Sequence, residues 1–218
     1  MTAALLEPGS GPGADSGPVA RISRGALRAN LALLHEAGTA SLPAELPADA
    51  WGHGAATVQA VLDEAGATVT ADRLATLLGL PGGDPRARPV MRLGGHVLGT
   101  KELRAGEGVS YGLTFRAAAD TRIVLVTGGY AQGVVRALGN RASVTCAGTT
   151  CPIVGRVAMD VCVVEIGDAH IGRGDEAMFF GDPRDGEPAL ADWVGATGMT
   201  AQEIVSLVGA RASRREVA

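Results

Sequence analysis

Residues 152–166 read PIVGRVAMDVCVVEI, two short runs of β-branched residues separated by a glycine and a polar turn. Similar runs at residues 122–126, 143–146 and 176–180 are separated by glycine-containing segments. Short strands with close turn signals are typical of compact antiparallel β domains. The pattern therefore predicts a mostly antiparallel β domain, which we place at residues 83–218.

Two helices are expected near the end of this domain, over residues 189–196 and 200–208. In the second, Thr200 precedes Glu203 by three residues. This is the capping-box pattern, in which the two side chains satisfy free amides at a helix N-terminus.

The first 82 residues differ in character. Residues 1–18 are rich in glycine, serine and proline, so we expect a disordered N-terminal tail. Residues 19–82 predict a short strand and then a helix to about residue 37, with Ser23 as its cap, and a second helix over residues 54–65.

Other signals in this part are weaker. A short strand or turn is expected near residues 45–50, and Val69 and Leu77-Leu78 are candidates for short strands. The breaker PGGDP at residues 81–85 marks the domain boundary. The predicted fold class is therefore α+β, with a short α/β part before the β domain.

Composition excludes several functions. A net charge of −4 gives no reason to expect nucleic-acid binding. No apolar run is long enough to cross a bilayer, and the N-terminus lacks the pattern of a secretion signal. The chain has an odd number of cysteines without metal-site spacing: Cys146, Cys151 and Cys162. We therefore expect reduced thiols and no metal site, and we expect a cytoplasmic location.

Four motifs then occur in order: GEGVSYG at residues 106–112, GYAQG at 129–133, RALGNR at 136–141 and PIVGRVAMD at 152–160. Together they resemble the C-terminal β domain of alanine racemases, where Gln132 stands in place of an aspartate. Residues 20–71 resemble, more weakly, the start of that family's N-terminal barrel. The resemblance implies a reaction that interconverts L- and D-alanine with pyridoxal phosphate as the electron sink.

The cofactor-bearing stretch departs from the family. Residues 46–54 read LPADAWGHG, whereas the family has K-A-D-A-Y-G-H-G. Pro47 therefore takes the place of the Schiff-base lysine, and proline has no amine with which to replace it. The single lysine, Lys101, falls in a segment that predicts a solvated β strand.

The resemblance also implies roles for other residues. Tyr111 matches the family's tyrosine base, and an inherited residue near an interface is the alternative. The remaining matches are Tyr130 and Met159 on the substrate side, Trp51 and His53 on the cofactor side, Gln202 in place of a further tyrosine, and Arg211 and Arg214 in the family's R-x-P-R ending.

The barrel itself is too short. An eight-stranded barrel needs roughly 250 residues, but only about 60 separate Ala20 from Pro81. Most of the cofactor cradle should be missing, so we expect little binding of pyridoxal phosphate. Helix faces that a barrel would cover should be exposed, so we expect a dimer or poor solubility.

Four hypotheses follow. The chain is a degenerate racemase without activity of its own, or it pairs with a full-length alanine racemase and lends Tyr111 to it. Alternatively it is an active racemase that uses Lys101 or unbound cofactor, or its β domain has an unrelated binding role. The expected assembly is a homodimer, or a heterodimer with a full-length racemase.

Overall fold

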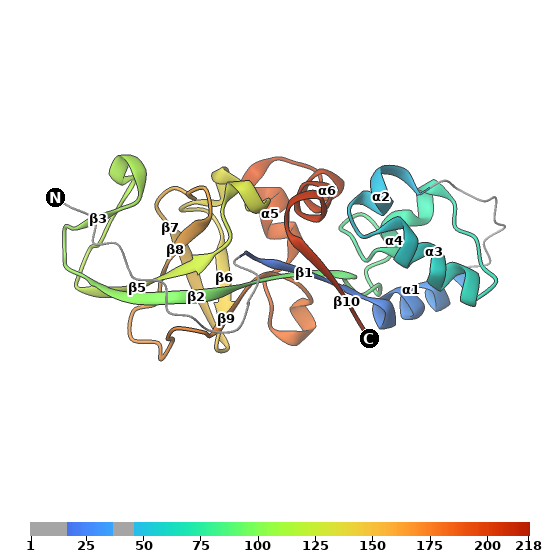
Figure 1. Ribbon diagram of the computed structural model, residues 1–218, viewed down its shortest axis with the longest axis horizontal. Coiled ribbons are helices and arrows are strands. Elements are labelled where there is room, and N and C mark those ends of the chain that lie inside the picture. Colours follow the sequence, from blue (N-terminus) through green and yellow to red (C-terminus); the bar gives the residue numbers. More distant parts are fainter. Residues whose placement is uncertain (1–16, 37–45) are drawn as a thin grey trace.

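The computed structural model describes residues 17–36 and 46–218. The molecule is elongated, with a β barrel at one end, a group of helices at the other, and α5 (Leu190–Thr197) and α6 (Ala201–Arg211) between them (Figure 1). The predicted N-terminal tail falls outside the described residues except for residues 17 and 18. The division of the chain at residues 82 and 83 stays a prediction, and one apolar core runs from Ala20 to Val208.

Six strands close into a barrel in the order β2-β5-β8-β7-β6-β9, and β9 pairs back with β2. Every pair within this ring is antiparallel. The strands are β2 (Met91–Leu103), β5 (Thr121–Thr127), β6 (Ser143–Cys146), β7 (Thr149–Val154), β8 (Val161–Glu165) and β9 (Glu176–Phe180). Closure removes free strand edges from the ring, and the predicted antiparallel β domain is confirmed.

β2 connects the barrel to the rest of the chain. Its first half pairs with β1 (Val19–Ser23) and β9, and its second half pairs with β5. Three glycines interrupt its sequence, and one has a packing reason: a Cβ atom on Gly95 would lie 2.2 Å from the Thr127 carbonyl oxygen. β1 also pairs in parallel with β10 (Ser213–Val217), which the sequence did not indicate.

Four helices pack together at the far end: α1 (Arg24–Glu36), α2 (Pro47–Trp51), α3 (Ala55–Glu64) and α4 (Leu74–Leu77). The predicted helices α1 and α3 are confirmed, and the Ser23 hydroxyl accepts a hydrogen bond of 3.0 Å from the Ala26 amide. The expected strands at Val69 and Leu77-Leu78 are wrong. Val69 lies in irregular chain, and Leu77 ends α4, where it is buried.

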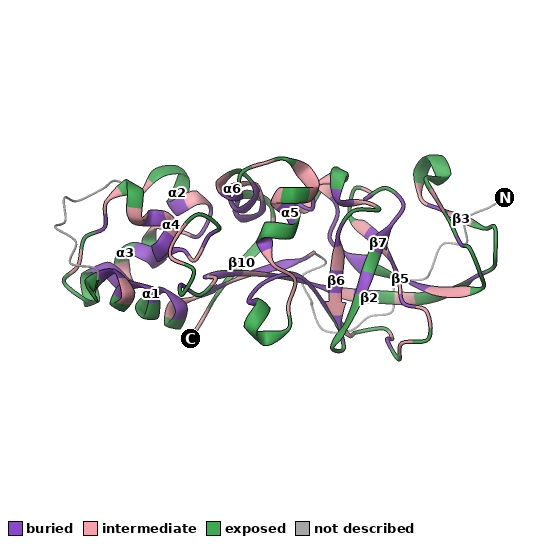
Figure 2. Cartoon of the chain, turned by 180° about the vertical axis from the view of Figure 1, so that it is seen from behind, coloured by how far each residue is buried: buried purple, intermediate pink, exposed green. Residues whose placement is uncertain are grey.

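The expectation of exposed helix faces is also wrong for the residues that the structure describes. The large hydrophobic side chains exposed there are Leu98, Tyr111, Leu113, Leu125 and Met159, and all of them lie in the β domain. The apolar residues of α1, α3 and α4 pack against one another instead. The tip of the hairpin formed by β3 (Gly108–Val109) and β4 (Phe115–Arg116) is exposed (Figure 2).

α5 (Leu190–Thr197) and α6 (Ala201–Arg211) confirm the two predicted C-terminal helices. The Glu203 amide donates to the Thr200 hydroxyl at 3.2 Å, and the Glu203 carboxylate accepts from the Thr200 amide at 2.7 Å, so the capping box is present. Within the described part of the chain, no helix is long and apolar enough to span a membrane.

Candidate functional site

α2 lies in the stretch that resembles the family's cofactor-bearing segment. Its backbone forms a turn of left-handed helix. Ala48, Asp49 and Ala50 have φ angles between 47° and 57° and ψ angles between 46° and 48°. In this conformation an L-residue holds its Cβ atom close to the next carbonyl oxygen, so such a run persists only where other contacts hold it.

Those contacts come from both sides. One Asp49 oxygen accepts a hydrogen bond of 2.6 Å from the Ala55 amide, and the other pairs with Arg214 on β10. The Ala55 amide and Arg214 together hold the pKa of Asp49 below its ordinary value. On the other side Gly52 packs on α6, where a Cβ atom on Gly209 would lie 2.1 Å from the Gly52 oxygen.

His53 follows this turn and is buried. Its Nδ1 atom lies 3.0 Å from the Ala50 oxygen and 3.1 Å from the Trp51 oxygen, so it carries the proton and donates to them. Its Nε2 atom is buried without a hydrogen-bond partner. Burial lowers the pKa of His53 to about 4, which keeps the ring neutral at pH 7.

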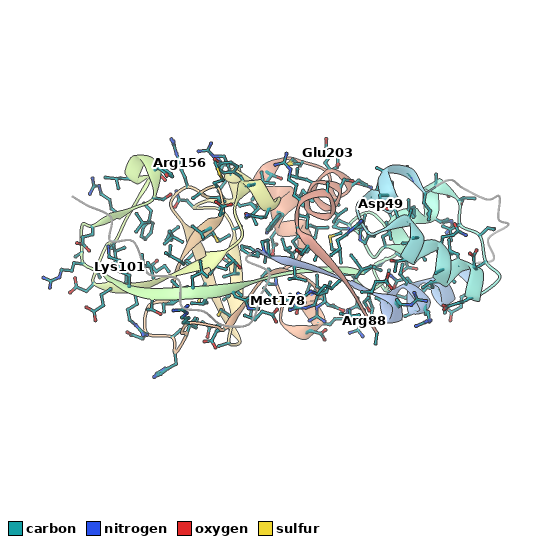
Figure 3. The ribbon with its side chains drawn as sticks, in the orientation of Figure 1. Asp49, Arg88, Lys101, Arg156, Met178 and Glu203 are labelled. Carbon is teal, nitrogen blue, oxygen red and sulfur yellow. The ribbon has the colours of Figure 1, made fainter. Side chains whose placement is uncertain are left out.

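The surroundings of α2 supply no lysine. Pro47 is the first residue of the turn, and the single lysine of the chain is Lys101 on β2. Lys101 is exposed and pairs with Ile123 in the ladder between β2 and β5. Figure 3 shows Lys101 and Asp49 at opposite ends of the molecule, so one chain does not bring Lys101 to the α2 turn.

Tyr130 and Met159 lie together on two adjoining turns of the β domain. The Tyr130 amide donates to the Ala158 oxygen at 3.0 Å, and the Ala131 amide donates to the Met159 oxygen at 3.0 Å. The turns are close because Gly129 has no side chain: a Cβ atom there would lie 2.1 Å from the Met159 oxygen. The Met159 side chain itself is 54% exposed.

Polar side chains hold the Tyr130 turn from several directions. The Gln132 amide group bridges the Gly129 amide, at 2.9 Å, and the Asp160 carboxylate, at 2.8 Å. The Arg136 guanidinium lies 4.9 Å from the centre of the Tyr130 ring, a cation–π contact. Arg211 at the end of α6 is exposed, and it donates to the backbone carbonyl oxygen of Tyr130 at 3.1 Å, so it contacts the Tyr130 turn.

Tyr111 lies on the loop between β3 (Gly108–Val109) and β4 (Phe115–Arg116), and the residue is 71% exposed. The neighbouring Ser110 hydroxyl donates to the Arg156 oxygen at 2.5 Å. Arg156 belongs to the same motif as Met159. Residues 155–160 therefore support both the Tyr111 loop and the Tyr130 turn.

The predicted residues thus fall into two groups. Tyr111, Tyr130 and Met159 are connected through residues 155–160. Trp51 ends α2 and His53 follows it, and α2 and the β3–β4 hairpin lie at opposite ends of the molecule (Figure 1). Asn140 and the bridging role of Gln132 were missed, although both residues stand inside recognised motifs. In the described residues no cluster of histidine, cysteine or acidic side chains could hold a metal ion.

Comparison with known proteins identifies relatives of the β domain and of the fold. Residues 90–216 match the model of the family described as alanine racemase, C-terminal domain. An alanine racemase from Thermobifida fusca is 43% identical over 136 residues, which are 62% of this chain and 36% of that protein. This chain therefore spans well under half the length of that relative.

Two solved structures extend the comparison. The alanine racemase from Streptomyces coelicolor has a TM-score of 0.63 at 29% identity, covering 98% of this chain and 64% of that one. The biosynthetic alanine racemase from Pseudomonas aeruginosa has a TM-score of 0.80 at 18% identity, covering 93% of this chain and 99% of that one, which shows a shared fold. With more than half of its residues matched by the family model, the chain belongs to the alanine racemase C-terminal domain family.

Proposed function

We propose that this chain does not racemise alanine by itself, and that its β domain lends Tyr111 to the cofactor-bearing barrel of a full-length alanine racemase. The observation that carries the proposal is the contrast between its two candidate groups. The β-domain group keeps Tyr111, Tyr130 and Met159, with Tyr111 71% exposed. The α2 turn begins with Pro47 and has no lysine at its first position.

The residues at α2 do not fit pyridoxal phosphate held on a lysine. A cofactor of this kind needs a primary amine for its covalent attachment, and Pro47 has none. The described residues 46–90 contain helices and turns but no strand, so they do not supply the strand ends at which a barrel gathers its catalytic groups. We therefore derive no step through a cofactor bound to this chain.

The β-domain residues are suited to a lent role. An exposed phenol on a short hairpin can enter a concave site on a partner subunit. That partner, the full-length racemase, would supply the amine and the cofactor. There Tyr111 would hold or move the proton on one face of the substrate. The exposed Met159 side chain would add an apolar contact from the turn that adjoins Tyr130.

The geometry supports the proposed partner arrangement. The Tyr111 loop and the α2 turn lie at opposite ends of the molecule, so Tyr111 does not reach α2 of its own chain (Figure 1). We propose a heterodimer with a full-length racemase as the functional assembly, in preference to a homodimer whose two α2 turns would both begin with Pro47.

The test uses a full-length alanine racemase whose own tyrosine base has been changed to Phe. Mixing it with this chain should restore formation of D-alanine from L-alanine, and mixing it with the Tyr111→Phe chain should not. Equal rates with both chains, or no restoration with either, would contradict the lent role. Changing Lys101 to Ala serves as a matched control, since it should leave the restored rate unchanged.

A second candidate is a racemase that is active through Lys101. It is favoured by the exposure of Lys101 on the strand that leads to the Tyr111 hairpin. In that case borohydride reduction of the protein in the presence of pyridoxal phosphate should attach the cofactor to Lys101, detectable by peptide mass spectrometry. Labelling that is unchanged in Lys101→Ala would rule this candidate out.

A further inference from the structure

The backbone before Tyr111 is held in a conformation that favours glycine. Ser110 has φ 61° and ψ 178°, and Leu113 on the same loop has φ 44°. A serine at these angles is strained, and such strain persists only where surrounding contacts determine the geometry. Strained residues of this kind cluster at active sites, ligand clamps and switch regions.

One contact acts on Ser110 directly. Its hydroxyl donates to the backbone carbonyl oxygen of Arg156 at 2.5 Å, which holds the turn against residues 155–160. Gly155 allows this approach because it has no side chain: a Cβ atom there would lie 2.8 Å from the Ser110 Cβ atom. The Arg156 guanidinium also lies against the loop, with Cζ 3.5 Å from where a Cβ atom on Gly112 would be.

A second contact holds the other end of the loop and runs through Asn140. The Asn140 Oδ1 atom accepts a hydrogen bond of 2.6 Å from the Gly155 amide, and its Nδ2 atom donates to the Thr114 hydroxyl at 3.2 Å. Asn140 itself has φ 62°, a conformation that asparagine tolerates better than most residues. Its amide therefore connects the end of β7 to the far side of the Tyr111 loop.

We propose that Asn140 is a positioning residue for Tyr111: together with the Ser110–Arg156 contact, it fixes the direction in which the β domain presents the phenol. This inference rests on the proposed function for its consequence, because a lent base must meet the substrate in a defined geometry. A displacement of about 1 Å can reduce a rate by about 100-fold.

The first test reads the orientation of Tyr111 without any activity. The chain contains two tyrosines, so incorporation of 3-fluorotyrosine gives two ¹⁹F signals, which the Tyr130→Phe variant assigns. Thr114→Val removes the hydroxyl that Asn140 bonds, and Thr114 is exposed, so the fold should survive. The Tyr111 signal should shift and narrow in Thr114→Val and in Asn140→Gly, and should stay native in Thr114→Ser.

Asn140→Gly is preferred to Asn140→Ala because glycine adopts positive φ without strain. If Asn140→Gly fails to fold, Thr114→Val and Thr114→Ser still decide. A Tyr111 signal that is unchanged in a folded Thr114→Val variant would overturn the proposal.

The second test uses the mixed assembly with the tyrosine-deficient racemase. Thr114→Val should lower the restored kcat by a factor on the order of 10 to 100, with KM for alanine nearly unchanged and Thr114→Ser restoring the rate. An unchanged kcat in Thr114→Val would overturn the positioning role. If the unmodified chain restores no activity, the proposed function fails, and the ¹⁹F result still decides whether Asn140 orients Tyr111.

Discussion

Asp49 on the left-handed turn of α2 forms an ion pair with Arg214 on β10, two residues that are far apart in the chain. The same carboxylate accepts a hydrogen bond from the first amide of α3. One side chain thus joins three elements and holds a backbone conformation that L-residues rarely adopt.

Replacing Asp49 with Ala should lower the free energy of unfolding by about 1 kcal/mol at pH 7, since it removes the partner of a free helix amide. The folded state depresses the pKa of Asp49, so this contribution is present above the unfolded pKa of 3.8 and is lost as pH falls through the lower folded value. Urea unfolding at pH 7 and at pH 2.5 checks this. An equal difference at both pH values would contradict it.

The buried His53 predicts a loss of stability in mild acid. Its pKa is about 4 in the folded protein and 6.5 when unperturbed, so only the unfolded state takes up its proton between these values. The contribution of His53 to the free energy of unfolding should therefore be constant above pH 6.5, become more destabilising as pH drops from 6.5 to 4, and level off below that.

The full loss of stability predicted from the lowered pKa of His53 is about 3 kcal/mol. Comparing urea midpoints of the unmodified chain with those of His53→Gln at pH 7.5 and pH 4.5 isolates this contribution. If the two proteins lost stability in parallel, another group would be responsible.

Gly209 on α6 lies close to Gly52, whereas Gly195 on α5 has free space around it. Alanine substitutions at these two helical glycines should therefore change the stability in opposite directions. Gly209→Ala places a Cβ atom 2.1 Å from the Gly52 oxygen, so overpacking should destabilise the protein by about 1–3 kcal/mol. Gly195→Ala on α5 meets no atom within 4 Å, and should stabilise the protein by about 0.5–1 kcal/mol. Thermal unfolding of both variants checks the sign of each, and two shifts of the same sign would argue against the contact.

The three cysteines should be inert in the folded protein. Cys146, Cys151 and Cys162 are all buried and free. Burial raises the pKa of Cys146 to about 11 and that of Cys162 to about 12, and raises that of Cys151 as well. Thiolate is the reactive form, so DTNB at pH 8 should label none of them rapidly in the native protein and all three in urea. Rapid native labelling of any one would contradict the described burial.

The strands with strong local signals were predictable from the sequence. Runs of valine and isoleucine located β5 and β8, and Thr200 with Glu203 located the start of α6. β2 was predicted only around Lys101, because Gly94, Gly95 and Gly99 weaken its strand pattern. At Gly95 the reason is the packing against Thr127, which lies far away in sequence.

Other features had no local signal. β10 contains Arg214, Arg215 and Glu216, and it becomes a strand by pairing with β1 at the opposite end of the chain. The alanine-rich stretch of α2 would suit an ordinary helix, and its left-handed form depends on Arg214 and Gly209. Motif resemblance selected Tyr111, Tyr130 and Met159, but it gave no indication that Asn140 bonds both Gly155 and Thr114.

The central claim is that this chain alone does not racemise alanine. The most direct measurement is formation of D-alanine from L-alanine by the purified chain with excess pyridoxal phosphate, followed by chiral chromatography. We predict no D-alanine above the rate given by pyridoxal phosphate without protein. Turnover above that rate, abolished in the Lys101→Ala or Tyr111→Phe variant, would contradict the account and show that the chemistry proceeds without a lysine at the position of Pro47.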